Sequence, residues 1–579
     1  EACDSLGLYV ECELSGWHWA HPTIVGKQLV KEMITRDENH PSIIFWSNGN
    51  EGGFNYELEP DFAFWDKQKR VVLYPWANRN GFETKHYRSY GETQEYMRQK
   101  EIFMPTEFLH GLYDGGHGAG LKDYWDMMMA NPRCAGGFLW DLMDQGVVRT
   151  DKNNYVDCMG NFGADGIVGP HAEKEGSYYT IKEVWCPVQL TWNDVEKGEL
   201  TLSNQYNFVN LKNCRFSYRL LQMPAMGSTQ VKVLKQGNLS SPDVAPGKEA
   251  QVKIPMMANA DAVEIKAVNH EGEEIMTWSR GVKSEERRVK NSSAPSTSSA
   301  AYADQADAVE VKAGGRTYRF AKKDGRLMGV EVGSKAISLS NGPRFMAARR
   351  SDRSLDQFYN HDDKEAEKKK TLYTEFVDQG AFAGFEWKEA EAKLVATYQH
   401  GSLDEVDWQF LSDGSVAVTC HYNFGGVVDM MGMAFDYPES KVRSKAWVGN
   451  GPYRVWQNRE QGPQYGYWQN DYNDPIPAES WDYPEFKGYF ANVKWMQFKT
   501  DEGKIGFSGL TADEHMGVYT PRDGRDGLLY TLPQTGLAVF KVIPSVRNKV
   551  NTTDLNGPSA QPKWLNGKGK VEFTLNFEL

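Results

Sequence analysis

The first 187 residues alternate between short apolar runs and segments whose apolar residues recur at helical spacing. Apolar runs that end in polar or glycine-rich sequence predict buried strands, here at 6–14, 42–49, 70–77, 84–87, 102–108 and 134–142. A helix is predicted behind Pro22 by apolar residues at helical spacing, namely Ile24, Val25, Leu29, Val30, Met33 and Ile34. Further helical segments are expected near 57–68, 92–101 and 119–131. Repeated strand-helix units indicate a parallel sheet, open or closed into a barrel.

After Pro187 the pattern changes to strands separated by polar turns. Residues 188–285 have the length and alternation of an immunoglobulin-like β-sandwich. Residues 286–308 combine charge with Ser, Ala and Pro, which predicts a linker or an exposed crossover. Residues 309–579 form a second all-β region, long enough for one large sandwich. The sequence therefore predicts an α/β part followed by two β-sandwiches.

Composition narrows the class of protein. The chain of 579 residues carries 65 Lys and Arg against 78 Asp and Glu, a net charge of -13, so we expect no nucleic-acid or anionic-membrane partner. The mean hydropathy is -0.61 and no apolar run approaches the ~18 residues of a membrane helix. The 18 Trp and 28 Tyr suit either a sugar-binding surface or large sandwich cores. Seven cysteines without a Cys-x-x-Cys pair predict no disulfide framework and no zinc site, and most should be reduced and buried.

Two carboxylates stand at the carboxyl ends of predicted strands, where a barrel places its catalytic groups. Glu51 follows the run IIFWSNGN, and Glu107 follows IFMPT. From the residue pattern alone, the alternatives are an acid/base pair or two solvated loop carboxylates.

Longer matches point to one family. RDENHPSIIFWSNGNE (36–51) resembles the acid/base segment of glycoside hydrolase family 2, PTEFLHG (105–111) its nucleophile segment and GGFLWDLMDQG (136–146) its last barrel strand. With CDSLGLYV (3–10) and NFGADG (161–166), the matches follow the family's order through nearly all of the first 187 residues. The resemblance implies a partial TIM barrel made of strands three to eight, and a retaining glycosidase with a carbohydrate substrate and no cofactor.

The same resemblance implies roles for individual residues. Glu51 would be the acid/base and Glu107 the nucleophile, a pair whose carboxyl groups lie about 5–5.5 Å apart in retaining enzymes. Acid/base catalysis requires one of these carboxyl groups to exchange a proton with the leaving group and then with water.

Four further residues would bind the sugar or orient the nucleophile: Asn50, Tyr87, His110 and Trp140. Asn50 resembles a family asparagine that hydrogen-bonds the sugar 2-hydroxyl, and Tyr87 a tyrosine that holds the nucleophile ionised. His110 resembles a histidine that contacts sugar hydroxyls, and Trp140 a tryptophan on which the sugar stacks. A turn residue, a packed tyrosine, an ordinary histidine and a structural tryptophan are the alternatives.

The chain departs from the metal-dependent β-galactosidases of this family. Those enzymes carry a Glu-x-His pair for magnesium after the strand that resembles LGLYVECEL, whereas this chain has SGWHWAH with Trp17 in place of the carboxylate. His18 and His21 alone make a poor site for a cation that prefers oxygen ligands. We therefore predict no magnesium site, and the family's sodium-binding residues are not recognisable.

The C-terminal region carries a resemblance of its own. Residues 431–459 resemble the small-chain domain of large β-galactosidases, a super-sandwich, and 483–495 match it more loosely. That domain favours a β-galactosidase, with a β-glucuronidase or another family 2 glycosidase on plant or algal glycans as the alternative. Four arginines either serve a sulfated or uronic substrate or form a solvated basic face: Arg349, Arg350, Arg353 and Arg454.

The matches begin at the helix before the third barrel strand, so two strands and the family's amino-terminal domains are missing from this sequence. We expect the missing half of the barrel to come from the rest of a longer chain or from another chain, and a homo-oligomer is a further option. An open barrel remnant exposes two sheet edges. A non-catalytic carbohydrate-binding or assembly fragment is therefore the alternative from another functional class. A periplasmic or secreted location is favoured by the class of enzyme alone.

Overall fold

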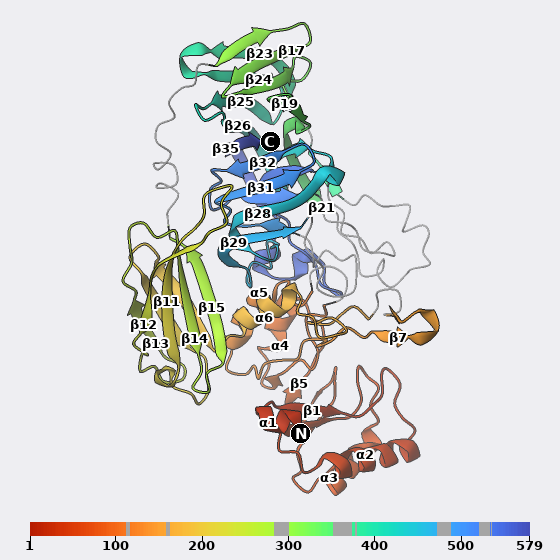
Figure 1. Cartoon of the computed structure of the whole chain (residues 1–579). Coiled ribbons are helices and arrows are strands. Elements are labelled where there is room, and N and C mark those ends of the chain that lie inside the picture. The colour runs from red at the N-terminus through yellow and green to blue at the C-terminus, as the bar shows by residue number, and fades with distance from the viewer. Residues whose placement is uncertain are drawn as a thin grey trace, which may run out of the picture.

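The computed structural model describes residues 1–111, 116–157, 163–282, 300–350, 373–376, 379–471, 488–519, 533 and 535–579. Figure 1 shows three parts: an N-terminal α/β part at the bottom, a small sandwich beside it and a large sandwich above. No helix in the described part of the chain is long and apolar enough to span a membrane.

Parallel strand pairing organises the N-terminal part. One parallel sheet has the order β1 (Val10–Glu13), β2 (Ile43–Ser47), β3 (Val71–Leu73). A second has β4 (Asn78–Arg79) antiparallel to β5 (Phe82–Glu83), which runs parallel to β6 (Ile102–Phe103). A short hairpin of β7 (Val147–Arg149) and β8 (Tyr155–Asp157) follows. The helices are α1 (Ala2–Leu6), α2 (Thr23–Asp37), α3 (Glu59–Trp65), α4 (Tyr90–Tyr96), α5 (Leu121–Met129) and α6 (Gly176–Val184).

The helix α2 forms where the apolar spacing predicts it. Its residues Val30 and Ile34 are fully buried in one cluster with Trp46 of β2, so the helix covers one face of the sheet. Burying such side chains stabilises the contact by roughly 1.5–3 kcal/mol each. The first turn differs from the prediction, because Ile24 is 86% exposed and Val25 is 48% exposed.

The predicted strands of this part are all longer than the strands that form, and 84–87 forms none, because β5 already ends at Glu83. The run 6–14 begins with helix α1, which ends at Gly7 with a left-handed φ of 71°, and only Val10–Glu13 forms a strand. In the run 134–142 the structure has only isolated parallel bridges, Phe103 to Cys134 and Phe108 to Leu139. The segment passes close to its neighbour, since a Cβ on Gly137 would lie 3.0 Å from the ring of Pro105.

The middle part is a two-sheet sandwich. The three-stranded sheet has the order β13 (Glu249–Lys253), β10 (Glu199–Asn204), β9 (Val188–Asp194). The four-stranded sheet has the order β12 (Lys232–Leu239), β11 (Arg215–Gln222), β14 (Ala262–Val268), β15 (Glu274–Gly281). Alternate residues of both sheets enter one core, among them Leu200 and Leu202 from one and Ile265 from the other. Seven antiparallel strands over these described residues agree with the expected immunoglobulin-like sandwich.

The C-terminal part is a much larger sandwich. One sheet runs β16 (Ala301–Asp304), β17 (Ala308–Ala313), β18 (Arg316–Ala321), β19 (Leu327–Val332), β21 (Ser340–Arg350), β27 (Met430–Asp436), β34 (Leu537–Val542), β33 (His515–Val518), β30 (Tyr489–Phe490), with β20 (Lys335–Ile337) on β19 and β22 (Tyr373–Glu375) on β21. The other runs β23 (Ala381–Lys388), β24 (Lys393–Gln399), β25 (Leu403–Phe410), β26 (Val416–Val428), β35 (Lys563–Glu578), β32 (Lys504–Ser508), β31 (Trp495–Thr500), β28 (Val442–Gly451), β29 (Gln464–Asp471). Fully buried Trp408, Trp447 and Phe320 lie in their common core.

Strand β16 lies within the range 286–308 that the sequence suggested as a linker. It pairs with β17, from Ala301 opposite Lys312 to Asp304 opposite Val309. The part of that range from 286 to 299 lies outside the described residues.

The described cysteines are free thiols. Cys186, Cys214 and Cys420 are buried, whereas Cys3, Cys12 and Cys134 are only half-buried. The prediction that most are buried is therefore too strong, and Cys158 lies outside the described residues.

The large sandwich packs directly on the barrel part, as the blue ribbon above α5 and α6 in Figure 1 shows. Asp123 of α5 accepts a hydrogen bond of 2.7 Å from the backbone of Ser559. Glu183 of α6 accepts one of 2.7 Å from the backbone of Gly462. The first contact holds the connection between β34 and β35, residues 543–562, against α5, and the second holds the connection between β28 and β29 against α6.

Candidate active site

Glu51 and Glu107 lie at equivalent places, each four residues beyond the end of its strand, β2 and β6 respectively. One carboxylate oxygen of Glu51, one carboxylate oxygen of Glu107 and one ring nitrogen of His86 all lie within 4.8 Å of one another. Retaining glycosidases hold their carboxyl groups about 5–5.5 Å apart and inverting ones about 6.5–9.5 Å. The two predicted carboxylates thus come together at the shorter of these separations.

A tight turn, Gly49 to Gly53, presents Glu51. Gly49 has a φ of 76°, and a Cβ there would lie 2.3 Å from the backbone oxygen of Gly53. Glu51 itself has a φ of 48°, in the left-handed region that costs about 1–3 kcal/mol for such a residue. The glycine-rich sequence NGNEGG therefore permits a turn that points this carboxylate back over the strand ends.

Glu51 is surrounded by hydrogen-bond donors. Trp17 Nε1 donates to Glu51 Oε2 over 2.8 Å, and His86 Nδ1 lies 3.1 Å from Oε1. His18 Nε2 lies 3.6 Å from Oε2. Burial raises the pKa of Glu51, but the hydrogen bonds from His86 and Trp17 together outweigh burial and leave the pKa below its usual value.

Glu107 is held by the two residues that the sequence predicted beside it. Tyr87 donates its phenolic hydrogen to Glu107 Oε2. Asn50 Nδ2 donates to Glu107 Oε1 over 3.2 Å. Burial raises the pKa of Glu107 above its usual value, although the neighbouring His86 and the Tyr87 hydroxyl act in the opposite direction. The pKa of Glu51 is therefore lower than that of Glu107. A proton donor at Glu51 and an ionised nucleophile at Glu107 would usually require the opposite order.

His86 connects the two carboxylates, and the sequence analysis did not assign it a role. It is 1% exposed, its Nδ1 lies 3.6 Å from Glu107 Oε2, and its Nε2 lies 2.6 Å from the hydroxyl of Thr106. The sequence did offer one signal for His86, since it directly precedes Tyr87 at the end of a predicted strand. His86 thus holds both carboxylates in one buried polar group.

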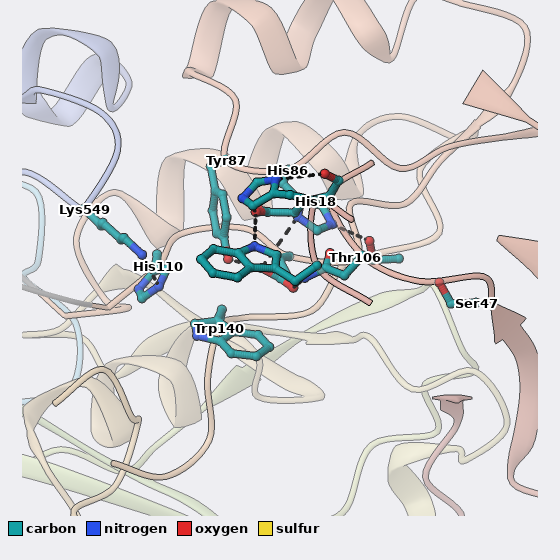
Figure 2. Close-up of polar contacts among 12 residues, drawn as sticks. His18, Ser47, His86, Tyr87, Thr106, His110, Trp140 and Lys549 are labelled. Carbon is teal, nitrogen blue, oxygen red and sulfur yellow. Dashed lines mark hydrogen bonds and ion pairs between the residues drawn. The ribbon is translucent and has the colours of Figure 1, made fainter. Parts of the chain in front are cut away.

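A second group of residues lines the other side of the site. The ring centroid of His110 lies 5.5 Å from that of Tyr87 and 6.4 Å from that of Trp140. Trp140 Nε1 donates to Asp165 Oδ2 over 3.2 Å. Figure 2 shows Lys549 reaching His110 from the side opposite His18. All six residues predicted from sequence therefore lie around one site, with Asp165, His86 and Lys549 added by the structure.

Two polar atoms of the site are left open for a ligand. Asn50 Oδ1 and Asp165 Oδ1 are buried and have no hydrogen-bond partner among the described residues. Buried polar atoms are almost always paired, so exceptions call for a water or a ligand. Sugar hydroxyl groups can donate to both oxygens.

Two further carboxyl groups, Glu11 and Glu13, lie on one face of β1, where Glu11 is half-buried and Glu13 is exposed. Burial raises the pKa of Glu11 to about 7, and the charge of Glu107 adds to this effect. The sequence did not predict a role for these two glutamates, because the segment 6–14 has the pattern of an apolar run.

The residues beside Glu51 do not fit a magnesium ion. Trp17, which stands where metal-dependent relatives have a carboxylate, donates a hydrogen bond to Glu51 and offers no oxygen ligand. The closest metal-like group here consists of Glu51, His86 and Glu107 themselves. A second group, on the large sandwich, consists of Glu405, Asp407 and His421, where Lys393 Nζ already lies 3.2 Å from Asp407.

The arginines considered for an acidic substrate have other contacts. Arg454 is 4% exposed, lies over the ring of Phe490 and donates to the backbone oxygen of Val518. Arg349 pairs with Asp429 at 3.0 Å. Both have structural roles in the large sandwich, and Arg353 lies outside the described residues.

Three family models match the chain in sequence order. Residues 2–167 match the TIM barrel domain of glycosyl hydrolases family 2, 200–277 match domain 4 of β-galactosidase, and 312–537 match the β-galactosidase small chain. Their boundaries correspond to the three parts of the structure, which is a partial TIM barrel followed by sandwiches.

The curated relatives that match this chain are named β-galactosidase. A β-galactosidase of Oenococcus oeni is 22% identical over 98% of this chain and 60% of its own length. A β-galactosidase of Photobacterium profundum is 28% identical over 38% of this chain and 26% of its own length. A β-glucuronidase structure from Parabacteroides merdae is 14% identical, covers 60% of this chain and 50% of its own, and has a TM-score of 0.26, too low to support an argument.

The chain spans at most about 60% of the length of these curated relatives. The three matched models nevertheless follow one another from residue 2 to residue 537, in the order barrel, domain 4, small chain. The chain is therefore a β-galactosidase-like member of glycoside hydrolase family 2.

Proposed function

We propose that this protein is a retaining exo-glycosidase, a β-galactosidase that removes terminal β-galactosyl units from oligo- or polysaccharides. The observation that carries the proposal is the approach of Glu51 and Glu107 to within 4.8 Å, in a site bordered by an indole and open polar atoms. The family membership supports glycoside hydrolysis. The names of the curated relatives support galactose as the sugar.

In the first step Glu107 attacks the anomeric carbon, and the bond to the leaving oxygen breaks as Glu51 gives that oxygen its proton. Tyr87 and Asn50 each donate a hydrogen bond to Glu107, which fixes the direction of attack. Trp140 supplies the apolar face against which the sugar ring lies. The product of this step is a glycosyl ester on Glu107 and a free alcohol.

In the second step Glu51 is a carboxylate and accepts a proton from water, whose oxygen attacks the anomeric carbon. The ester bond breaks, and Glu107 leaves as a carboxylate. His86 and Trp17 stabilise the ionised form of Glu51 that this step requires. The sugar is released with the configuration that it had in the substrate.

The pKa order of the free protein bears on the first step. Because the pKa of Glu51 lies below its usual value and that of Glu107 above, a single shared proton resides mainly on Glu107 before substrate binds. The reactive form, with the proton on Glu51, is then the minority form. An aglycone that covers Glu51 removes water from it and favours its protonated form.

We further propose that additional barrel strands complete the site beside β1, either from the rest of a longer chain or from another chain. In the described residues β1 pairs with β2 only. The carboxyl groups of Glu11 and Glu13 on β1 are then covered by that missing part. The coverage of relatives, at most about 60% of their length, is consistent with this proposal.

The test is covalent trapping on the complete protein. A dinitrophenyl 2-deoxy-2-fluoro-β-galactoside reacts at the first step and hydrolyses slowly at the second, so the sugar stays attached. We expect mass spectrometry of the digested protein to find the label on the peptide that contains Glu107. Label on Glu51 would reverse the assigned roles, and absence of label together with absence of turnover of any aryl β-glycoside would support the non-catalytic alternative.

A further inference from the structure

Lys549 reaches the sugar side of the site from the far end of the chain. It lies in the connection 543–562 between β34 and β35, and its Nζ is 3.0 Å from Nε2 of His110, 439 positions earlier in the sequence. Its backbone nitrogen also donates to the backbone oxygen of His110 over 3.4 Å. Two residues later, Asn551 donates to the backbone oxygen of Tyr87 over 3.2 Å. The ammonium group is thus held against the site by contacts on both sides of Lys549.

The ammonium group is short of partners. Burial lowers the pKa of His110 well below its usual value, and the charge of Lys549 lowers it further, so the imidazole is neutral and Nε2 accepts from the ammonium. An ammonium has three N–H donors. Among the described residues, no carboxylate oxygen lies within 4.0 Å of Lys549 Nζ, and His110 is its one side-chain hydrogen-bond partner.

Carboxylates are near enough to act on Lys549 without touching it. Asp165, Glu51 and Glu107 favour its charged form, yet burial outweighs them and lowers its pKa. The nearest of these to the imidazole is Asp165, whose Oδ2 lies 3.8 Å from His110 Nε2. A half-buried cation without a counter-ion in contact is unfavourable, and an anionic ligand removes that cost.

We propose that Lys549 is a specificity-determining residue that binds an anionic substituent of the sugar, either the carboxylate of a uronic acid or a sulfate ester. The inference rests on the proposed function, because the sugar that reaches His110 is the one between Trp140 and the two glutamates. A neutral hydroxyl would satisfy one N–H of the ammonium but would leave its charge uncompensated. Lys549 thereby makes charged galactosides, rather than lactose-like ones, the preferred substrates.

The neighbouring Asp165 does not oppose an anionic ligand. Burial, together with the charge of Asp141, raises the pKa of Asp165 to about 7. At acid pH this carboxyl group is therefore largely protonated, and its open Oδ1 atom then lies beside the ligand without a full negative charge.

The experiment compares charged and neutral ligands on the complete protein. Wild type, Lys549→Met, Lys549→Arg and the control Lys568→Met, an exposed lysine on β35, are assayed with nitrophenyl β-galactoside, β-galacturonide and β-galactoside 6-sulfate. We expect wild type to prefer a charged glycoside, and Lys549→Met to lose about tenfold to a hundredfold in kcat/KM on it but less than threefold on the neutral one. Lys549→Arg should keep the preference. The two charged substrates separate a carboxylate from a sulfate.

Equal losses on charged and neutral glycosides would overturn the proposal and leave Lys549 as a positioning residue for His110. Calorimetric titration of wild type with galacturonate, galactose 6-sulfate and galactose needs neither turnover nor a folded variant. Tighter binding of galactose than of both charged sugars would also overturn it. If instead the proposed function is wrong, wild type would bind a charged sugar but would hydrolyse none of the glycosides.

Discussion

The indole nitrogen of Trp17 donates a 2.8 Å hydrogen bond to Oε2 of Glu51. By the resemblance to metal-dependent β-galactosidases, a carboxylate ligand would be expected at position 17, beside the proposed acid/base. A neutral donor stabilises the ionised form of Glu51, as a cation would, but it cannot exchange with solvent ions. The chain thereby sets the pKa of Glu51 with its own side chains.

Trp17→Phe should raise the pKa of Glu51, because the variant removes a hydrogen bond to the carboxylate and leaves the burial in place. Glu51 has the lower pKa of the pair, so its titration sets the acidic limb of kcat/KM. We expect that limb to move to higher pH. Trp19→Phe, a change at a side chain that is 82% exposed, is the matched control and should leave the profile unchanged. Movement of the basic limb instead would show that the pKa order of the two glutamates is wrong.

Glu51→Gln should discriminate between leaving groups. A dinitrophenolate leaves without a proton, so we expect less than tenfold loss in kcat/KM on the dinitrophenyl glycoside. An unactivated phenol needs general acid assistance, which typically contributes 10²–10⁴-fold, and the loss there should be of that order. Glu107→Gln should abolish turnover of both substrates. Similar losses of Glu51→Gln on the two substrates would contradict its role as proton donor.

Tyr87→Phe should lower kcat, because it removes the phenolic donor to Glu107 while keeping the ring. A hydrogen bond to a charged group is worth about 1.5–3 kcal/mol, which corresponds to roughly tenfold to 150-fold. Tyr90→Phe serves as control, since Tyr90 packs edge-on against Tyr124 on the other side of the same segment. An unchanged kcat in Tyr87→Phe, with wild-type thermal stability, would leave Tyr87 as a packing residue.

Asp123→Ala should loosen the connection that carries Lys549. Asp123 accepts a hydrogen bond from the backbone of Ser559, and its loss costs about 1–3 kcal/mol of local stability. We expect the amide of Ser559 to exchange roughly fivefold to 150-fold faster with deuterium, and kcat/KM on a charged glycoside to fall with it. Asp126→Ala, one turn away on α5 and exposed, is the control. Unchanged exchange at Ser559 would remove Asp123 from the anchoring contacts.

The local elements of the fold could be predicted because their cause is local. Helix α2 follows from apolar spacing behind Pro22, and β2 follows from the run that ends in the turn of Glu51. The strands of the small sandwich follow from period-two alternation, as in β10 and β14. The irregular backbone was not predicted, since the apolar run 134–142 forms only isolated bridges.

The sequence, through its strand ends and its resemblance to the family, determined the candidate residues of the site: Glu51, Glu107, Asn50, Tyr87, His110 and Trp140. Only the tertiary structure decided how these groups are tuned. The order of the two pKa values depends on burial and on donors from Trp17 and His86, which no local pattern encodes. The approach of Lys549 to His110 depends on a sandwich packing against a barrel across 439 positions of sequence. Hydrophobic periodicity predicts the secondary structure of the segment that contains it. The pKa of a side chain instead depends on the charges and the burial that the whole fold brings within a few ångströms.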